Sequence, residues 1–182
     1  PLAVQNKIAE REKNMFLFFG RLSPEKGVDT AIEALALLGE EKRLWIVGDG
    51  PDRQRLEALA AEKGLATRVT FFGSLYGDEL ESMKQRAEAI ILPSRWYENF
   101  PYTLSESLQS GCVVVAANIG GMTERITDRV NGLLFQASDA RSLADALLSL
   151  ESLPLDTIHN QASASVADLT EEAFAAQLIP IY

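Results

Sequence analysis

Short apolar runs alternate with helical patterns along most of this sequence, and that alternation limits the fold more than any other feature. The runs have the length and the nearly continuous hydrophobicity of strands that are buried on both faces. They are MFLFF (15–19), RLWIV (43–47), RVTFF (68–72), AIILP (89–93), CVVVA (112–116) and GLLF (132–135). The clearest helical pattern, PDRQRLEALAAEKG, has Pro51 near its first turn and closes at Gly64. The alternation predicts an α/β fold, a doubly wound parallel sheet of six strands with helices on both faces.

The last part of the chain has a different pattern. Residues 155–182 hold two helical patterns, joined near residues 167–170, with no strand between them. We therefore expect one sheet domain over residues 1–154 and a C-terminal helical tail over residues 155–182. The tail would pack on the sheet domain or reach a neighbouring domain. Because the chain begins at Pro1 without a methionine, we expect it to be a piece of a longer protein.

The composition excludes several classes of function. The formal net charge of −9 leaves no basic surplus to neutralise the phosphates of a nucleic acid. No apolar run approaches the roughly 20 residues of a membrane-spanning helix. The single cysteine, Cys112, rules out an internal disulfide and fits a reducing compartment. We expect a cytoplasmic protein, and the sequence leaves open a peripheral position at the inner face of the membrane.

The sequence lacks the side chains for two common kinds of catalytic site. The only histidine, His159, lies in the tail, where we expect it to be solvated, so no Ser-His-Asp or Cys-His arrangement can be built. No His/Cys cluster and no Asp-x-Asp occurs, so the sequence predicts no metal site.

Polar or glycine-rich loops follow five of the predicted strands. In an open parallel sheet the carboxyl ends of the strands share one edge, where ligands bind. The loops are GRLSPEKG (20–27), GDGP (48–51), GSLYG (73–77), SRWYENFPY (94–102) and NIGGMTE (118–124). Connecting loops are often polar and rich in glycine, so single loops carry little weight. The set of five predicts a binding edge.

The first of these loops has the chemistry of a phosphate site. GRLSPEKG places Arg21 and Lys26 just before a helix, with Gly20 and Gly27 allowing the backbone to turn. Two cations and exposed amides suit a phosphate or a diphosphate. Two solvated surface cations remain the alternative interpretation. No P-loop motif occurs.

Two further glycine-rich loops favour structural interpretations. GDGP resembles the start of a dinucleotide fingerprint, but Arg53 occupies the third glycine position and the loop follows the second strand. Gly48 and Gly50 therefore indicate a tight turn that lets the next helix pack closely. Gly120 and Gly121 could hold an anion at a short helix or form a sharp turn, and the turn is slightly favoured.

The stretch ENFPYTLSE contains two glutamates, Glu98 and Glu106, at the start of a predicted helix. Pro101 indicates that the helix begins between Asn99 and Pro101, which leaves Glu98 in the loop. If the whole stretch were helical, the glutamates would be roughly 12 Å apart. The paired carboxylates of glycosidases are closer, at about 5 to 10 Å. The pair therefore suits the two ends of an elongated, hydroxyl-rich ligand such as a nucleotide sugar, although simple capping by Glu98 stays open.

Five motifs together resemble a known family. GRLSPEKG, ENFPYTLSE, SGCVVVA, GGMTE and NGLLF, in this order, resemble the C-terminal, donor-binding domain of GT-B fold retaining glycosyltransferases of group 1 (family 4). The resemblance covers residues 16–150. It implies two facing Rossmann-like domains, of which the C-terminal one binds a nucleotide-sugar donor and the N-terminal one binds the acceptor. Val113 stands where the family often has proline and Ser107 where it often has alanine, and we expect neither to remove the chemistry.

The resemblance also implies roles for particular residues. Arg21 and Lys26 would bind the diphosphate and stabilise the charge of the leaving group. Glu98 would contact the donor sugar and Glu106 the ribose. The remaining implied substrate-binding residues are Gly20, Asn99, Phe100, and the amides of Tyr102 and Thr103, with Gly73 and Leu75 at the base. The family needs no metal and no cofactor, and its donors are UDP-, GDP- or ADP-sugars.

These motifs predict the donor-binding half of a retaining, hexosyltransferase-type glycosyltransferase. Its partners would be the nucleotide-sugar donor and an N-terminal GT-B domain of the same full-length chain. Without that domain the piece should transfer little or no sugar, because closure of the cleft completes such sites. Two alternatives remain: a non-catalytic α/β nucleotide-binding or interaction module, and a related GT-B epimerase or phosphorylase.

Overall fold

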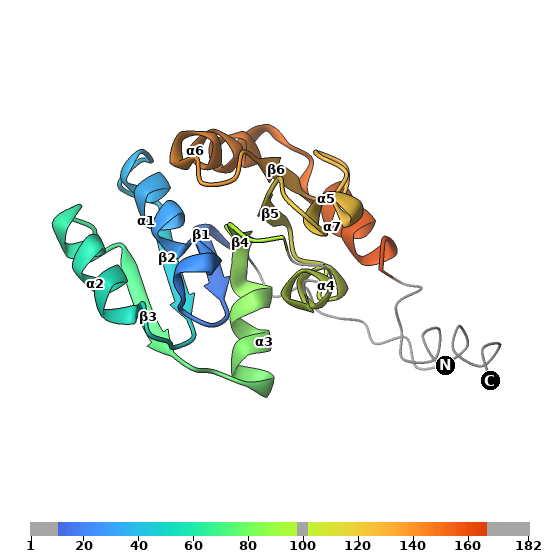
Figure 1. The fold of residues 1–182 in the computed structure, drawn as a ribbon. Helices are drawn as coiled ribbons and strands as arrows, with labels where there is room; N and C mark the ends of the chain where they lie inside the picture. Colours follow the sequence, from blue (N-terminus) through green and yellow to red (C-terminus); the bar gives the residue numbers. More distant parts are fainter. Residues whose placement is uncertain (1–10, 98–101, 167–182) are drawn as a thin grey trace.

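The chain folds around a six-stranded parallel sheet. The computed structural model describes residues 11–97 and 102–166 of the 182 residues. All neighbouring strands are parallel, in the order β3-β2-β1-β4-β5-β6 (Figure 1). The strands are β1 (Glu12–Phe19), β2 (Arg43–Val47), β3 (Val69–Gly73), β4 (Ala87–Leu92), β5 (Val114–Ala117) and β6 (Leu133–Phe135). The predicted doubly wound sheet is confirmed, and its direction of winding changes between β1 and β4.

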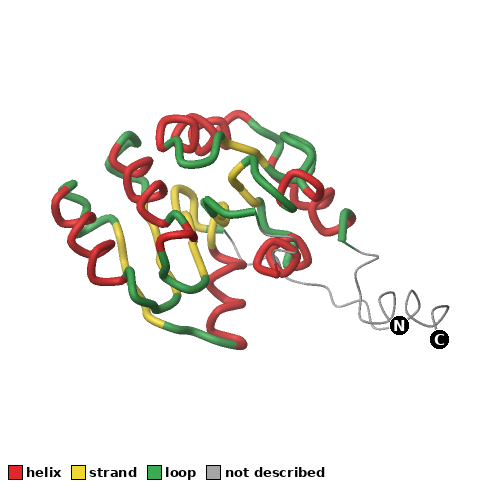
Figure 2. The backbone as a smooth tube through the Cα atoms, in the orientation of Figure 1, coloured by secondary structure: helices red, strands yellow, loops and turns green. Residues whose placement is uncertain are grey.

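Helices connect the strands and cover both faces of the sheet (Figure 2). They are α1 (Val28–Ala36), α2 (Arg53–Glu62), α3 (Gly77–Arg86), α4 (Tyr102–Gln109), α5 (Met122–Arg125), α6 (Ala140–Ser149) and α7 (Leu155–Ala164), with short 3-10 helices η1 (Pro24–Lys26) and η2 (Leu150–Ser152). Local signals set their ends: Asp139 accepts a hydrogen bond from the amide of Ser142 at the start of α6, and Gly64 adopts φ 71° after α2. No helix in the described part of the chain is long and apolar enough to cross a bilayer.

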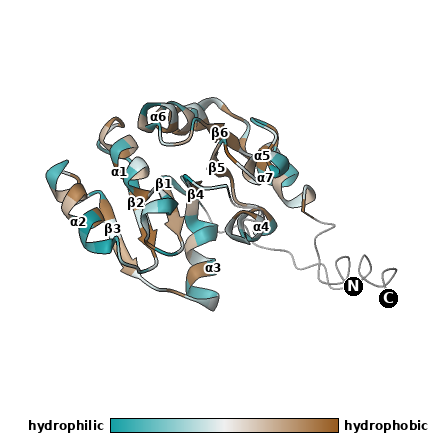
Figure 3. Cartoon of the chain, viewed as in Figure 1, coloured by the Kyte–Doolittle hydropathy of each residue, from teal (hydrophilic) through white to brown (hydrophobic). Residues whose placement is uncertain are grey.

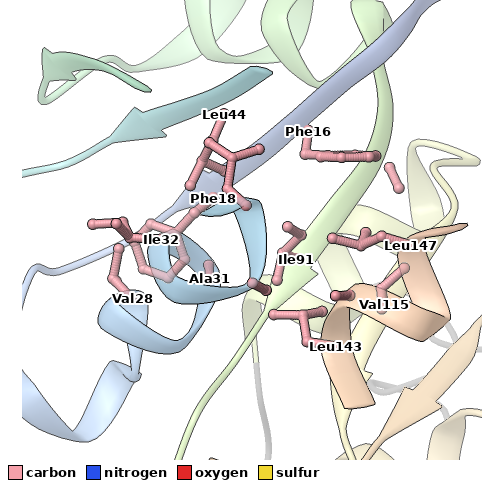
Figure 4. Close-up of a cluster of buried hydrophobic side chains, with 14 of the residues drawn as sticks. Phe16, Phe18, Val28, Ala31, Ile32, Leu44, Ile91, Val115, Leu143 and Leu147 are labelled. Carbon is pink, nitrogen blue, oxygen red and sulfur yellow. The ribbon is translucent and has the colours of Figure 1, made fainter. Parts of the chain in front are cut away.

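Alternate residues of the strands pack into two separate cores. Phe16 and Phe18 of β1 belong to a cluster with α1, α2 and α6, whereas Leu17 and Phe19 belong to one with α3, α4 and α5. Figure 4 shows side chains of β1, β4 and β5 lying against α1 and α6 on the first face. Hydrophobic residues concentrate on the strands and the inner sides of the helices (Figure 3). Burial on both faces explains why the strands are hydrophobic throughout.

The predicted strand ends are correct for β2 and shifted for others. β1 begins at Glu12, three residues before the apolar run, because Glu12 already pairs with Ala87 of β4. The register is irregular between Glu12 and Phe16, where the amide of Asn14 donates a 2.6 Å hydrogen bond to the Glu88 carboxylate. β5 begins at Val114, because the amide of Cys112 still bonds to the Ser107 carbonyl at the end of α4.

The first tail helix, α7, contacts α4 and contributes to the core. Ala162 and Ile158 are buried there. The second predicted tail helix lies outside the described residues, and the division of the chain at residue 154 stays a prediction. The expectation that His159 is solvated is wrong: its Nε2 is buried, with no hydrogen-bond partner among the residues that the structure describes.

The loops after β1, β2 and β3 are joined by backbone hydrogen bonds. The pairs are Gly20 N–Val47 O (3.0 Å), Leu22 N–Asp49 O (2.9 Å) and Gly48 N–Gly73 O (2.7 Å). This joining requires close approach of the first two loops: a Cβ added at Gly48 would lie 1.9 Å from the Gly20 carbonyl oxygen, and one at Gly50 would lie 2.2 Å from that of Leu22. The glycines of GDGP therefore allow the loop after β1 to pack against this loop. The sequence had suggested instead that they allow the following helix to pack closely.

Gly48→Ala should destabilise the protein by about 2–4 kcal/mol, because the new methyl group overlaps backbone and the φ of 135° is unfavourable for alanine. Urea unfolding measures this change. Gly64→Ala is the matched control, since Gly64 also has a positive φ (71°) but no atom lies within 4 Å of its added Cβ. Equal losses in the two variants would contradict a close approach of the loops.

His159 should make the protein less stable in acid. Burial, followed by the charge of Arg11, lowers the pKa of His159 from its usual 6.5 to about 4. The unfolded chain therefore binds this proton first, and stability falls as the pH drops from about 6.5 to about 4, by roughly 1–3 kcal/mol. Urea unfolding of the protein and of His159→Gln over this range tests the effect. The variant should lose less stability in acid, and parallel pH curves would refute the assignment.

Candidate functional site

A cavity of about 200 Å³ opens between the carboxyl ends of β1 and β4. It lies where the direction of winding changes, which is the usual ligand position in such sheets. Arg21 and Lys26 both line it, together with Gly20 and with Thr103 of α4. The structure thus brings together four of the residues that the sequence motifs single out.

A second cavity of about 310 Å³ lies beside the first, over the ends of β1, β2 and β3. Phe19, Gly20 and Arg21 line both cavities, so Arg21 lies where they meet. The wall of the second cavity is formed by Leu75, Tyr76 and other residues of the joined loops and α3 (Val47, Gly48, Asp49, Ser74 and Leu80). Gly73 lies just outside this wall, at the end of β3, where its carbonyl accepts the Gly48 amide.

Ion pairs fix the segment that carries Lys26. Arg95, which follows β4, donates to Asp29 Oδ1 over 2.7 Å, and its amide donates to the Glu25 carbonyl over 2.8 Å. Arg55 of α2 donates to Asp29 Oδ2 (3.0 Å) and to both oxygens of Asp52 (2.6 and 2.7 Å). Hydrogen bonds from Arg55 lower the pKa of Asp52. This network ties the loops after β1, β2 and β4 together behind the first cavity.

The cations of the first loop create a positive field. The pKa of Glu25 is lowered, first by a hydrogen bond from Ser23 Oγ (2.5 Å) and also by the charges of Arg21 and Lys26. No ion pair of Arg21 occurs within the described residues, and Arg21 is exposed. Arg21 is therefore placed to meet an anion from solvent.

Helix α4 carries the second glutamate of the ENFPYTLSE stretch. Glu106 lines neither cavity; its Oε1 accepts a 2.8 Å hydrogen bond from Lys84 Nζ of α3. Tyr102, at the start of α4, is 79% exposed. The other predicted residues of this stretch, Glu98, Asn99 and Phe100, lie outside the described residues, so their assigned roles stay predictions.

Sequence reasoning missed Lys84, although the sequence contains a signal for it. Leu80, Met83, Lys84 and Ala87 follow the i, i+3, i+4, i+7 spacing of one helix face, which places a lysine among apolar side chains. In the structure Met83 and Lys84 are buried. A buried cation near a predicted binding glutamate is a functional-site signal.

A third hollow of about 470 Å³ lies over the end of β5. Gly120, Gly121 and Glu124 line it together with Tyr97, which is 79% exposed. Thr123 Oγ1 donates to the Gly120 carbonyl over 2.9 Å, as expected for a sharp turn at α5. Within residues 11–97 and 102–166, no group of three or more His, Cys, Asp or Glu side chains could hold a metal ion.

Comparison with known proteins identifies the family. The family described as "Glycosyl transferases group 1" matches residues 3–168. The α-D-kanosaminyltransferase of Streptomyces kanamyceticus is 33% identical over 177 residues, which cover 94% of this chain and 46% of that protein. The crystal structure of Anabaena HepE in complex with UDP-glucose is 26% identical, with a TM-score of 0.86, over 96% of this chain and 49% of that one. This chain spans about half the length of these two proteins.

A third structure shows which half the chain resembles. The C-terminal domain of the group 1 glycosyl transferase LpcC from Francisella tularensis has the same fold, with a TM-score of 0.74 and 24% identity over 87% of this chain and 86% of that domain. The family match covers most of the chain. The chain therefore belongs to the group 1 glycosyl transferases, and its fold is that of the C-terminal half of a GT-B enzyme.

Proposed function

We propose that this chain is the donor-binding half of a retaining glycosyltransferase and holds a nucleoside diphosphate sugar across its two adjoining cavities. The observation that carries the proposal is the position of Arg21, which lines both cavities where they meet. A nucleotide sugar has its diphosphate in the middle, between the nucleoside and the sugar. A UDP-sugar is the first candidate, because the similar HepE structure contains UDP-glucose.

The first cavity suits the diphosphate. The guanidinium of Arg21 can bridge two phosphate oxygens, and Lys26 supplies a second positive charge on the same wall. Both cations would stabilise the charge that develops on the nucleoside diphosphate as it leaves. The ion pairs of Arg95 and Asp29 hold the Lys26 segment in place, so little rearrangement is needed at that step.

The second cavity suits the base. Leu75 and Tyr76 offer an apolar surface, while Asp49 and Ser74 offer polar groups at the same wall. Gly73 shapes this loop through its hydrogen bond to Gly48. The ribose would then lie between the base and the diphosphate, and we assign its hydroxyls to Glu106 on α4.

The donor sugar would lie at the opposite end of the first cavity, toward the start of α4. Thr103 lines the cavity there. We assign Glu98 to the sugar hydroxyls, and Asn99, Phe100 and the amide of Tyr102 to the sugar or phosphates. We assign acceptor binding to an N-terminal domain in the longer protein, since the chain spans about half of its relatives. The 182-residue chain should bind donor and transfer little sugar.

Arg21→Ala and Lys26→Ala should each weaken binding of UDP by about tenfold or more, because each loses a charge-assisted hydrogen bond to phosphate. Isothermal titration calorimetry of the 182-residue chain with UDP, GDP and ADP measures the effect and identifies the preferred base. Lys63→Ala is the matched control, since Lys63 is an exposed cation at the C-terminal end of α2, away from the ligand edge of the sheet. Unchanged dissociation constants in both site variants would refute the diphosphate assignment.

A further inference from the structure

Lys84 of α3 is a buried cation beside the proposed site. Its side chain is only 3% exposed, and its ammonium bonds to two carboxylates, Glu106 Oε1 at 2.8 Å and Glu81 Oε2 at 2.7 Å. Burial works against the charged form, but the hydrogen bonds that Lys84 donates to Glu106 and Glu81 outweigh it and raise the pKa of Lys84. Ser110 Oγ also bonds to Glu81 Oε2, at 3.3 Å. Lys84 is therefore a fixed positive charge between α3 and α4.

The contacts of Lys84 place it behind the wall of both cavities. Its Nζ lies 5.7 Å from the centroid of the Phe19 ring, and Phe19 lines both cavities. Leu80, one helical turn before Lys84, lines the second cavity. Lys84 thus lies between this shared aromatic wall and the carboxylate of Glu106. In Figure 1, α3 and α4 lie next to each other on this side of the sheet.

The carboxylate of Glu106 is held by one oxygen only. Lys84 bonds to Oε1, while Oε2 has no hydrogen-bond partner within the described residues, and the side chain is 48% exposed. A carboxylate can accept several hydrogen bonds, so a ligand hydroxyl can reach the second oxygen while the first stays bound. Without Lys84, the three rotatable bonds of this glutamate would be free to move its carboxylate away.

We propose that Lys84 is a positioning residue for donor binding: it holds one oxygen of Glu106 so that the carboxylate faces the ribose hydroxyls of the nucleotide. This inference rests on the proposed function, which assigns Glu106 to the ribose. Lys84 itself touches no part of the nucleotide. Its contribution is to fix the acceptor before the ligand arrives, which lowers the entropic cost of forming the hydrogen bond.

A purely structural ion pair between α3 and α4 is the competing explanation. Loss of a structural pair would lower stability, and would weaken the binding of every nucleotide alike. Loss of a positioning pair would instead reduce the preference for nucleotides that carry ribose hydroxyls. The informative quantity is therefore the ratio of dissociation constants for a nucleoside diphosphate and its 2′,3′-dideoxy counterpart.

The experiment measures that ratio by calorimetry in the 182-residue chain, with UDP and 2′,3′-dideoxy-UDP, or the GDP or ADP pair if that base binds better. The unmodified protein should prefer the ribose form by about tenfold, the value of a hydrogen bond to a charged acceptor. Lys84→Met should lose most of this preference, as should Glu106→Gln, while affinity for the dideoxy form stays nearly the same. Lys84→Arg, which keeps the charge, should restore part of it.

Lys42→Met is the matched control. Lys42 is equally buried and also pairs with a carboxylate, Glu151 at 2.6 Å, but it lies at the opposite edge of the sheet, before β2. This variant should keep the full preference for ribose even if it is less stable. If Lys84→Met fails to fold, Lys84→Gln, which removes the charge and keeps a polar donor, carries the same comparison.

The outcomes separate the two proposals. Failure of the unmodified chain to bind UDP, GDP or ADP would overturn the proposed function, and this inference with it. A ribose preference that Lys84→Met and Lys84→Gln retain would overturn the inference alone. If Glu106→Gln leaves the preference for ribose unchanged, Glu106 is not the ribose acceptor, and the inference about Lys84 is overturned as well.

Discussion

The site depends on the close contact between the loops that follow β1 and β2. Parallel neighbouring strands deliver these loops to the same edge, but only glycine at position 48 lets their backbones approach to hydrogen-bonding distance. The contact holds the backbone on both sides of Arg21, through the bonds of Gly20 to Val47 and of Leu22 to Asp49. It also fixes Gly73 through the Gly48 amide, so the loops around the second cavity form one hydrogen-bonded unit, which shares Gly20 and Arg21 with the first cavity. A ligand that spans the two cavities meets a surface that is already formed.

The electrostatic design is a positive pocket in an acidic protein. The chain has a formal net charge of −9, yet the cavity at the switch point is lined by two cations. Other cations nearby are bound to carboxylates: Arg55 and Arg95 both pair with Asp29. In those pairs the positive charges of Arg55 and Arg95 are balanced by carboxylates. Arg21, in contrast, is exposed to solvent. A local pocket of this kind suits a small anion and would not attract a nucleic acid, which needs a broad basic surface.

Much of the fold could be predicted from hydrophobicity, because strands covered on both faces must be apolar throughout. The predicted ends failed where backbone pairing extended or delayed a strand, as with Glu12 and Cys112. The site was predictable to the extent that its residues lie in loops at strand ends, which is why Arg21 and Lys26 could be placed at one edge. Contacts between helices were not predictable. The burial of His159 Nε2 depends on how α7 packs, and the pairing of Lys84 with Glu106 depends on how α3 packs against α4. Such packing cannot be read from the sequence of one segment.

The two buried lysines show why burial by itself does not identify a functional residue. Lys42 and Lys84 are both almost inaccessible, and each bonds to a half-exposed glutamate. A buried ion pair adds little stability compared with well-packed apolar side chains, so neither lysine is explained by stability alone. Lys42 also bonds to Asn14 Oδ1 at 2.7 Å, which secures the irregular start of β1 far from the ligand edge. Lys84 instead bonds to Glu106 of α4, and its Nζ lies 5.7 Å from the centroid of the Phe19 ring, which lines both cavities. The two lysines therefore differ in their surroundings: Lys42 lies at the start of β1, whereas Lys84 lies behind a wall of both cavities. This difference in position, and not burial, is the basis for the positioning role proposed for Lys84.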